Sequence, residues 1–286
     1  MASLPIGRYV AYDSWLHKLD PRAKVFGSLA LMVCLFLQYS SISMTFSMLG
    51  LMVIIVGILL VASHIGFRRF ISSFTMFWIT AIFLVLIYIL IPRSNPMLPP
   101  AWNLNGWVVY YDSFTEAAKI LLRLFLMLEI SLVLTSTTKP LDLTFAFEWY
   151  MTPLKKIGFP ASEVAMTLSI ALRFIPTLLE DASRVMKAQA SRGVDFEHGG
   201  LWKKIRGITA LIIPLFVSSF IRSEELANAM ECRSYNPREE RTRYRVLKWK
   251  IGDTFAVIFI LCLLGGFAYL RATQLNVFAF FIEGAL

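Results

Sequence analysis

The sequence predicts an all-α protein: a polytopic membrane helix bundle of about five spans that also carries long amphipathic helices on the cytoplasmic side. Hydrophobic residues make up 57% of the 286 residues and charged residues only 16%, which is more apolar than a soluble core of this size requires. Five apolar segments approach the ~20 residues that cross ~30 Å of hydrocarbon. Between the fourth and the fifth, charged side chains recur every few positions, which is typical of helices outside the lipid.

Four of the predicted spans lie in the first half of the chain, at residues 25–39, 44–61, 71–91 and 115–135. The first follows Asp20 and Pro21, a favourable helix start with Asp as N-cap and Pro at the first helical position. A short basic loop at 63–70 joins the second span to the third. A long loop at 92–114, rich in Pro, Trp and Tyr, joins the third to the fourth.

We expect three regions along the chain. Residues 1–137 form an N-terminal membrane bundle of four spans, and residues 138–250 form a cytoplasmic or interfacial region. Residues 251–286 hold the last span, at about 253–270, and a short apolar tail.

The net charge of +9 would suggest a nucleic-acid partner in a soluble protein. Here the basic residues lie mostly between apolar segments, and the positive-inside rule accounts for them. The bias places the N-terminus in the cytoplasm and the chain in the cell membrane as a multi-pass protein, with the lipid bilayer and no nucleic acid as its partner.

Two helical patterns dominate the charged region. The first covers residues 161–192, with apolar residues at helical spacing, and Gly193 is a plausible stop for it. The second begins near Leu201 and continues to Arg233. Each pattern contains one proline, Pro176 or Pro214, which we expect to kink or break its helix.

Small residues are frequent on both patterns and let helix backbones approach closely. The candidates for close packing, or for contact with a membrane partner, are Ala182, Ala188, Ser218 and Ala227.

Both patterns end in an arginine between two small residues, as Ser191-Arg192-Gly193 and Cys232-Arg233-Ser234. The simpler explanation is that each arginine favours the negative end of a helix dipole, worth about 0.3–1 kcal/mol. The alternative is a docking site, because small neighbours leave a guanidinium free to bind an acidic groove of a partner bidentately. Recurrence of the same context favours docking.

Three long stretches carry a resemblance to a known family: HKLDPRAK at 17–24, LRFIPTLLEDASRVMKAQASRG at 172–193 and ELANAMECRSYNPREERTRYR at 225–245. Through them the chain resembles the transmembrane T component of energy-coupling factor (ECF) transporters, which are ATP-binding-cassette importers of vitamins and metal ions. The resemblance covers nearly the whole chain.

The resemblance implies a coupling protein with three partners: two ATP-binding-cassette ATPases and a small membrane-embedded substrate-binding subunit. In that family each small-Arg-small motif docks on one ATPase, a role carried over to Ser191, Arg192, Gly193, Cys232, Arg233 and Ser234. The second motif departs from the commoner Ala-Arg-Gly through Cys232 and Ser234. The resemblance further implies uptake of a vitamin or similar micronutrient, and that the apolar helix faces cradle the substrate-binding subunit.

No Walker A pattern appears, so the chain is not its own motor, and no hydrolase motif is found. We therefore expect a non-catalytic subunit that binds no cofactor or metal, with ATP and Mg²⁺ on the partner ATPases.

The rival is an intramembrane transferase acting on a lipid-linked substrate. Such an enzyme needs clustered Asp, Glu or His at the membrane face, often for a divalent metal, whereas the adjacent acidic pairs here read more easily as solvated helix faces. Glu129, inside the fourth predicted span, is either a proton or ion site or a paired or protonated core residue.

Overall fold

The computed structural model describes residue 12 and residues 14–37, 42–90, 100–104, 107–194, 200–236 and 249–273. Apart from one short hairpin these residues are helical, which confirms the predicted fold class. They belong to two compact units, one made of residues 1–146 with 247–286 and the other of residues 147–246.

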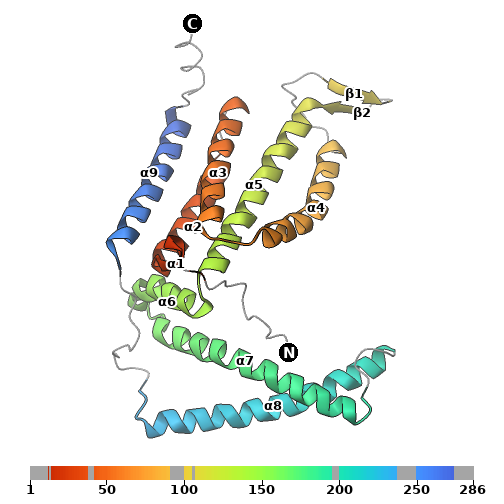
Figure 1. Ribbon diagram of the computed structural model, residues 1–286, viewed down its shortest axis with the longest axis vertical. Coiled ribbons are helices and arrows are strands. Elements are labelled where there is room, and N and C mark those ends of the chain that lie inside the picture. The colour runs from red at the N-terminus through yellow and green to blue at the C-terminus, as the bar shows by residue number, and fades with distance from the viewer. Residues whose placement is uncertain are drawn as a thin grey trace. The chain divides into compact units, whose positions relative to one another are not determined.

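The first unit contains most of the helices shown in Figure 1: α1 (Trp15–Lys18), α2 (Pro21–Phe36), α3 (Ile42–Ala62), α4 (Phe67–Leu90), α5 (Tyr111–Thr137) and α9 (Ile251–Thr273). Helix α5 packs against α2, α3 and α4, while α9 packs against α2. The last helix of the chain therefore completes the N-terminal bundle. Helix α6 (Pro140–Met151) begins in this unit and ends in the other.

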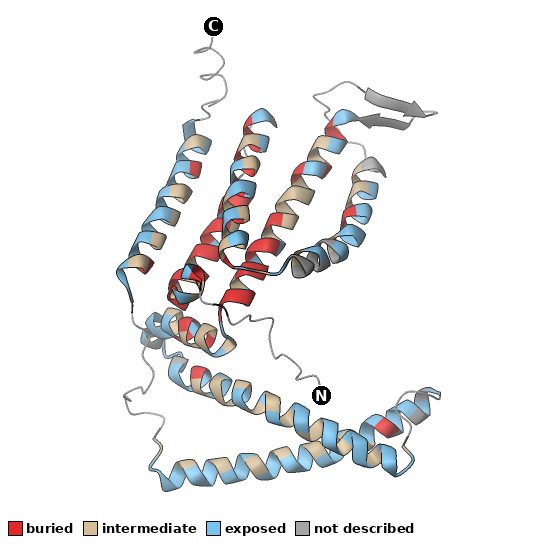
Figure 2. Ribbon diagram, in the orientation of Figure 1, coloured by how far each residue is buried: buried red, intermediate tan, exposed pale blue. Residues whose placement is uncertain are grey.

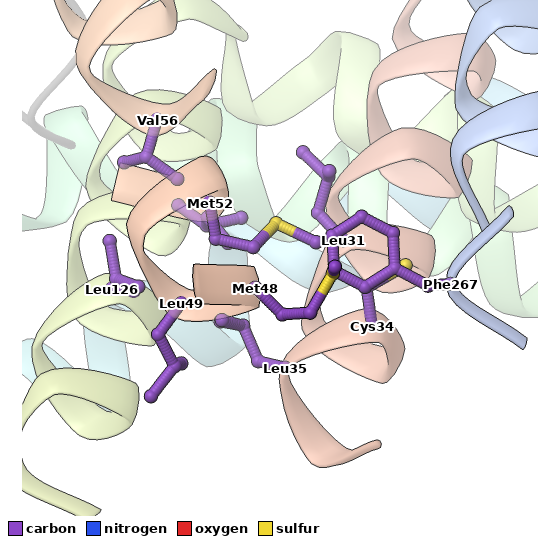
Figure 3. Packing of buried hydrophobic residues seen from close by; sticks show 10 residues of the cluster. Leu31, Cys34, Leu35, Met48, Leu49, Met52, Val56, Leu126 and Phe267 are labelled. Carbon is purple, nitrogen blue, oxygen red and sulfur yellow. The ribbon is translucent and has the colours of Figure 1, made fainter. Parts of the chain in front are cut away.

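Buried apolar side chains from four helices hold this bundle together (Figure 3). Leu31 and Leu35 of α2 meet Met52 of α3, which is 1% exposed, and Leu126 of α5 and Phe267 of α9 complete the cluster. Lipid tails are as apolar as leucine, so inside a membrane such side chains hold helices together through close van der Waals packing rather than through a hydrophobic driving force.

A polar clamp joins the start of α2 to two other helices of the same bundle. Asp20 caps α2 by accepting the Arg22 N–H at 2.9 Å, which confirms the predicted helix start. The carboxylate of Asp253 accepts the Asp20 N–H at 2.8 Å and the Lys250 N–H at 2.7 Å. It thereby caps α9 and ties that helix to α2.

Lys24 extends the clamp to α5, because its Nζ donates to the Thr137 carbonyl at 3.0 Å and to the His17 carbonyl at 3.2 Å. Through Lys24 the clamp thus holds α5 against α2.

The second unit contains η1 (Thr152–Ile157), α7 (Ala161–Ser191) and α8 (Leu201–Cys232). Helices α7 and α8 pack against each other, and in Figure 1 they run in roughly opposite directions. Among the described residues of these two helices only Ala165 and Gly207 are buried, whereas α2 and α5 each bury many residues (Figure 2). The unit is therefore a pair of long helices rather than a globule with its own core.

By length and apolar composition, four helices of the described part are able to cross a membrane: α3, α7 from Ser162, α8 from Lys204, and α9. Helices α3 and α9 match the predicted spans at 44–61 and 253–270. Helix α2 has only 16 residues, and α5 carries five charged side chains, Asp112, Glu116, Lys119, Arg123 and Glu129. The amphipathic α7 and α8 belong to this group because each combines an apolar stretch with a length above 30 residues.

Two local predictions need correction. The predicted loop at 63–70 is too long, because α4 already begins at Phe67, directly after Gly66. From Phe67 onward nothing in the sequence stops a helix. The predicted loop at 92–114 contains an antiparallel hairpin of β1 (Pro100–Leu104) and β2 (Trp107–Tyr110), followed directly by α5. Helices α7 and α8 both continue through Pro176 and Pro214, so neither proline breaks its helix, and the expected kink at each proline stays a prediction.

Some expectations concern residues outside the described part of the chain. These include most of the N-terminal segment, the basic stretch at 238–248 and the apolar tail at 274–286.

Candidate functional site: two arginine-capped helix ends

The ends of α7 and α8 have the same backbone geometry. Helix α7 ends at Ser191 with Arg192 as C-cap (φ −89°, ψ 8°), and α8 ends at Cys232 with Arg233 as C-cap (φ −94°, ψ 16°). We call these two ends, with their flanking residues, the arginine caps.

Each arginine cap is a complete Schellman motif. In α7 the Gly193 N–H donates to the Ala190 carbonyl at 3.0 Å, and the Val194 N–H donates to the Gln189 carbonyl at 3.1 Å. In α8 the equivalent bonds run from Ser234 to Glu231 at 2.8 Å and from Tyr235 to Met230 at 3.0 Å. These bonds satisfy carbonyls that a helix end otherwise leaves unpaired.

A Schellman motif requires a left-handed residue after the C-cap, and the two caps meet this requirement differently. Gly193 has φ +86°, which glycine adopts without penalty, whereas Ser234 has φ +55°. A non-glycine residue in this region carries a strain of roughly 1–2 kcal/mol. Ser234 therefore reproduces the geometry of the glycine motif and leaves the arginine in the same backbone position, but at a conformational cost.

The side chains of the arginine caps are open to a partner. Arg192 and Arg233 are both exposed, as are Ser191 and Cys232 beside them. Across the described residues neither guanidinium has a hydrogen bond or an ion pair. Each therefore offers a complete donor fork of the kind that binds carboxylates bidentately.

The prolines and small residues predicted from the sequence lie along the two helices but are not gathered at one place. Pro176 is half-buried and Pro214 is exposed. Ala182 is half-buried, while the other three small residues are exposed: Ala188, Ser218 and Ala227. Their exposure leaves them open to another protein or to lipid.

Helix α8 also has an exposed apolar face. Phe216 and Phe220 stack with ring centroids 6.4 Å apart and are 68% and 64% exposed. Ile212, Val217 and Ile221 are also more than half exposed. Apolar surface of this extent on one helix marks a contact with lipid or with another protein.

Two features missed by the sequence analysis are polar contacts between helices distant in sequence. One is the clamp on Asp253. The other is an ion pair between α7 and α8, in which Nη2 of Arg222 lies 2.8 Å from Oδ2 of Asp181. Helix periodicity identifies amphipathic helices but not which charged residues of two helices meet, so no local signal reveals either contact.

The remaining candidates lie in the first unit. Glu129 of α5 is 0% exposed, and its carboxylate oxygens have no hydrogen-bond partner among the described residues. An apolar cavity of about 540 Å³ lies among α2, α3, α5 and α9, with Lys24, Ser28 and Thr137 as polar exceptions in its lining. No group of three or more His, Cys, Asp or Glu suited to a metal ion occurs in the part of the chain that is described.

The fold and the site together define an α-helical integral membrane protein with two exposed, arginine-capped helix ends. The family model described as cobalt transport protein matches residues 12–244. Several curated relatives carry the name energy-coupling factor transporter transmembrane protein EcfT. The one from Bacillus subtilis is 37% identical over 278 residues, covering 95% of this chain and 100% of the relative.

The relative from Streptococcus thermophilus is 37% identical over 264 residues (92% of this chain, 97% of the relative), and that from Heliobacterium modesticaldum is 38% identical over 257 residues (90% and 93%). The chain therefore belongs to the family of transmembrane T components of energy-coupling factor transporters. It is a membrane-located, non-catalytic transporter subunit that works with other components of such a transporter.

Proposed function

We propose that this chain couples two ATP-binding-cassette ATPases to a small substrate-binding membrane subunit and so drives uptake of a vitamin or similar micronutrient. ATP and Mg²⁺ bind to the ATPases, while this chain binds no cofactor and performs no chemistry. Closure and opening of the ATPases move α7 and α8, and this movement reorients the substrate-binding subunit.

The observation that carries the proposal is the pair of equivalent arginine caps. Both caps have the same hydrogen-bond pattern, small flanking residues and an exposed guanidinium that has no partner in the described part of the chain. Two such ends match a motor of two ATPase subunits, with one arginine in an acidic groove of each. A bidentate guanidinium–carboxylate contact is stronger and more specific in its geometry than the point contact of a lysine.

The orientation follows from the distribution of charge. We propose that α2 to α5 and α9 cross the cell membrane with a cytoplasmic N-terminus, and that α7 and α8 lie along its cytoplasmic face. A helix of 31 or 32 residues is about 47 Å long, well beyond the ~30 Å hydrocarbon layer. The ion pair of Asp181 with Arg222, in the C-terminal parts of both helices, is also costly inside lipid.

The exposed apolar face of α8 supports a contact with the third partner, the substrate-binding membrane subunit. We propose that Phe216, Phe220 and the small residue Ala227, which lie on one face of α8, contact the substrate-binding subunit. The other small residues, Ser218 on the opposite side of α8 and Ala182 and Ala188 of α7, are proposed to allow close approach of neighbouring helices. Small side chains let membrane helices approach closely, and the aromatic pair supplies a large contact area.

The proposal is tested by tagging the chain, extracting it gently from its native membrane and identifying the co-purifying proteins by mass spectrometry. We expect two ATP-binding-cassette subunits and a small hydrophobic protein. A chain that purifies alone in several mild detergents, with a divalent-metal-dependent transferase activity, would instead support the enzyme alternative.

A further inference from the structure

The ion pair between α7 and α8 occupies equivalent places in the two helices. Asp181 lies eleven residues before Arg192, and Arg222 lies eleven residues before Arg233. Eleven residues of α-helix make three turns plus about 20°, a rise of about 16 Å. Each member of the pair therefore lies on nearly the same helix face as the arginine of its own cap, and at the same axial distance from it.

The two helix segments that run from the ion pair to the caps are also equivalent. Both prolines precede the pair in sequence, so neither segment contains a proline. Neither segment contains a glycine either, and both are helical up to the C-cap. Uninterrupted helices of this length transmit a displacement at one end to the other with little bending.

The pair itself is well placed to hold the helices in register. Its oxygen–nitrogen distance of 2.8 Å is that of a charge-assisted hydrogen bond, and the two side chains are only 24% and 33% exposed. Within the described residues it is the sole ion pair that joins α7 to α8. Apolar contacts alone permit sliding of one helix along the other, whereas a directional pair fixes one register.

We propose that the Asp181–Arg222 ion pair is the tie that sets the distance between the two arginine caps. It is a positioning pair that touches no ATPase. By fixing the register of α7 and α8 it holds Arg192 and Arg233 at the spacing of two ATPase grooves. The inference deepens the proposed function, because the spacing matters for transport only if both caps dock.

The first test measures the spacing directly in the full-length chain in lipid nanodiscs. Lys187→Cys and Asn228→Cys, both at exposed positions six residues beyond the pair, carry spin labels after Cys34, Cys232 and Cys262 are replaced by alanine. We expect one narrow distance distribution by pulsed electron paramagnetic resonance. Asp181→Asn or Arg222→Gln is expected to broaden or shift the distance distribution. The reversed pair, Asp181→Arg with Arg222→Asp, is expected to make the distribution narrow again.

The matched controls are Glu180→Gln and Arg184→Gln, which remove the same charges from α7 at exposed positions with no ion pair among the described residues. Both are expected to leave the distribution unchanged. Distributions that remain identical in Asp181→Asn and Arg222→Gln would overturn the proposal, as would broadening of equal size in the controls.

The second test uses the assembled transporter in proteoliposomes with native cysteines and measures substrate imported per ATP hydrolysed. Each single variant is expected to lower this ratio severalfold, and the reversed pair is expected to restore most of it. If the ratio stays at the wild-type value in the singles while the distance changes, the proposal fails. If no ATPase binds even the wild-type chain, the proposed function fails, whereas the distance measurement still tests the tie.

Discussion

One backbone angle decides whether α7 and α8 each end in an arginine cap. Gly193 and Ser234 both occupy the left-handed region, and the two hydrogen bonds of each cap depend on that conformation. The two caps therefore share one geometry, but only the cap at Ser234 is strained. The shared geometry supports equivalent roles for Arg192 and Arg233, and the strain at Ser234 can be tested by mutation.

Replacing Ser234 with glycine is expected to relieve strain at the second cap. The left-handed penalty of roughly 1–2 kcal/mol exceeds the entropic cost of glycine, about 0.5–1 kcal/mol. We expect the melting temperature of the purified protein to rise by about 1–3 °C. The reciprocal control, Gly193→Ala, is expected to lower it, and a fall in Ser234→Gly would contradict the strain at this cap.

Glu129 is either a proton or ion site or a packed core residue, and two substitutions distinguish these alternatives. Its carboxyl group is fully buried, and glutamine matches it in size without carrying a charge. If Glu129 is a core residue, Glu129→Gln retains transport in proteoliposomes, whereas Glu129→Lys loses folded protein because an unpaired buried charge is costly. We expect this outcome. Loss of transport in a well-folded Glu129→Gln protein would indicate a proton or ion site instead.

At the scale of elements, sequence reasoning was strongest where helices obey simple local rules. The Asp20-Pro21 start, the stop at Gly193 and the spans of α3 and α9 follow from capping and hydropathy, and the structure has them. The hairpin of β1 and β2 was missed because prolines and aromatic residues in a loop carry no clear strand alternation. Helix α6 was missed because its twelve residues are too few to stand out.

Contacts between helices lay beyond sequence reasoning for a physical reason. Asp253 meets Asp20 across 233 positions of sequence, and periodicity does not specify such pairs. The same holds for the ion pair of Asp181 with Arg222. By contrast, both arginines of the candidate site were identified from local context alone, because a small-Arg-small ending is visible within three residues.

The hydrogen bonds to Asp253 are expected to stabilise the membrane bundle. Asp253→Ala removes the acceptor of two backbone N–H groups, from Asp20 and Lys250. Leaving a buried donor unsatisfied costs about 1–3 kcal/mol, so we expect a lower melting temperature and a smaller yield of folded protein. The neighbouring Thr254→Ala loses only an exposed bond from Trp249 and serves as control. Equal stability of the two variants would contradict a structural role for the clamp.

At the scale of the whole molecule, the chain combines a bundle with a buried apolar core and a pair of helices whose apolar and charged side chains are exposed. The buried cluster of α2, α3, α5 and α9 belongs to the first unit, whereas α7 and α8 present apolar faces and charged ends (Figure 2). Membership of the T-component family accounts for this exposure, since such a subunit works with other transporter components.

The exposed aromatic pair of α8 tests the membrane partner separately from the ATPases. Phe216→Ser with Phe220→Ser is expected to reduce co-purification of the small hydrophobic subunit severalfold, because interface aromatic residues contribute strongly to binding. Retention of the ATPases should not change. Ile157→Ser, at an 87% exposed position in η1, is the control for loss of apolar surface. Unchanged recovery of the small subunit would place its contact elsewhere.

The most direct measurement of the central claim is ATPase retention by the double variant Arg192→Ala with Arg233→Ala, purified from its native membrane in mild detergent. Arg184→Ala with Arg206→Ala removes two exposed arginines from the same helices and controls for net charge. We predict that the double variant at the arginine caps loses its ATPases and its transport, while the control keeps both. Normal ATPase stoichiometry and normal uptake without Arg192 and Arg233 would contradict docking through the caps.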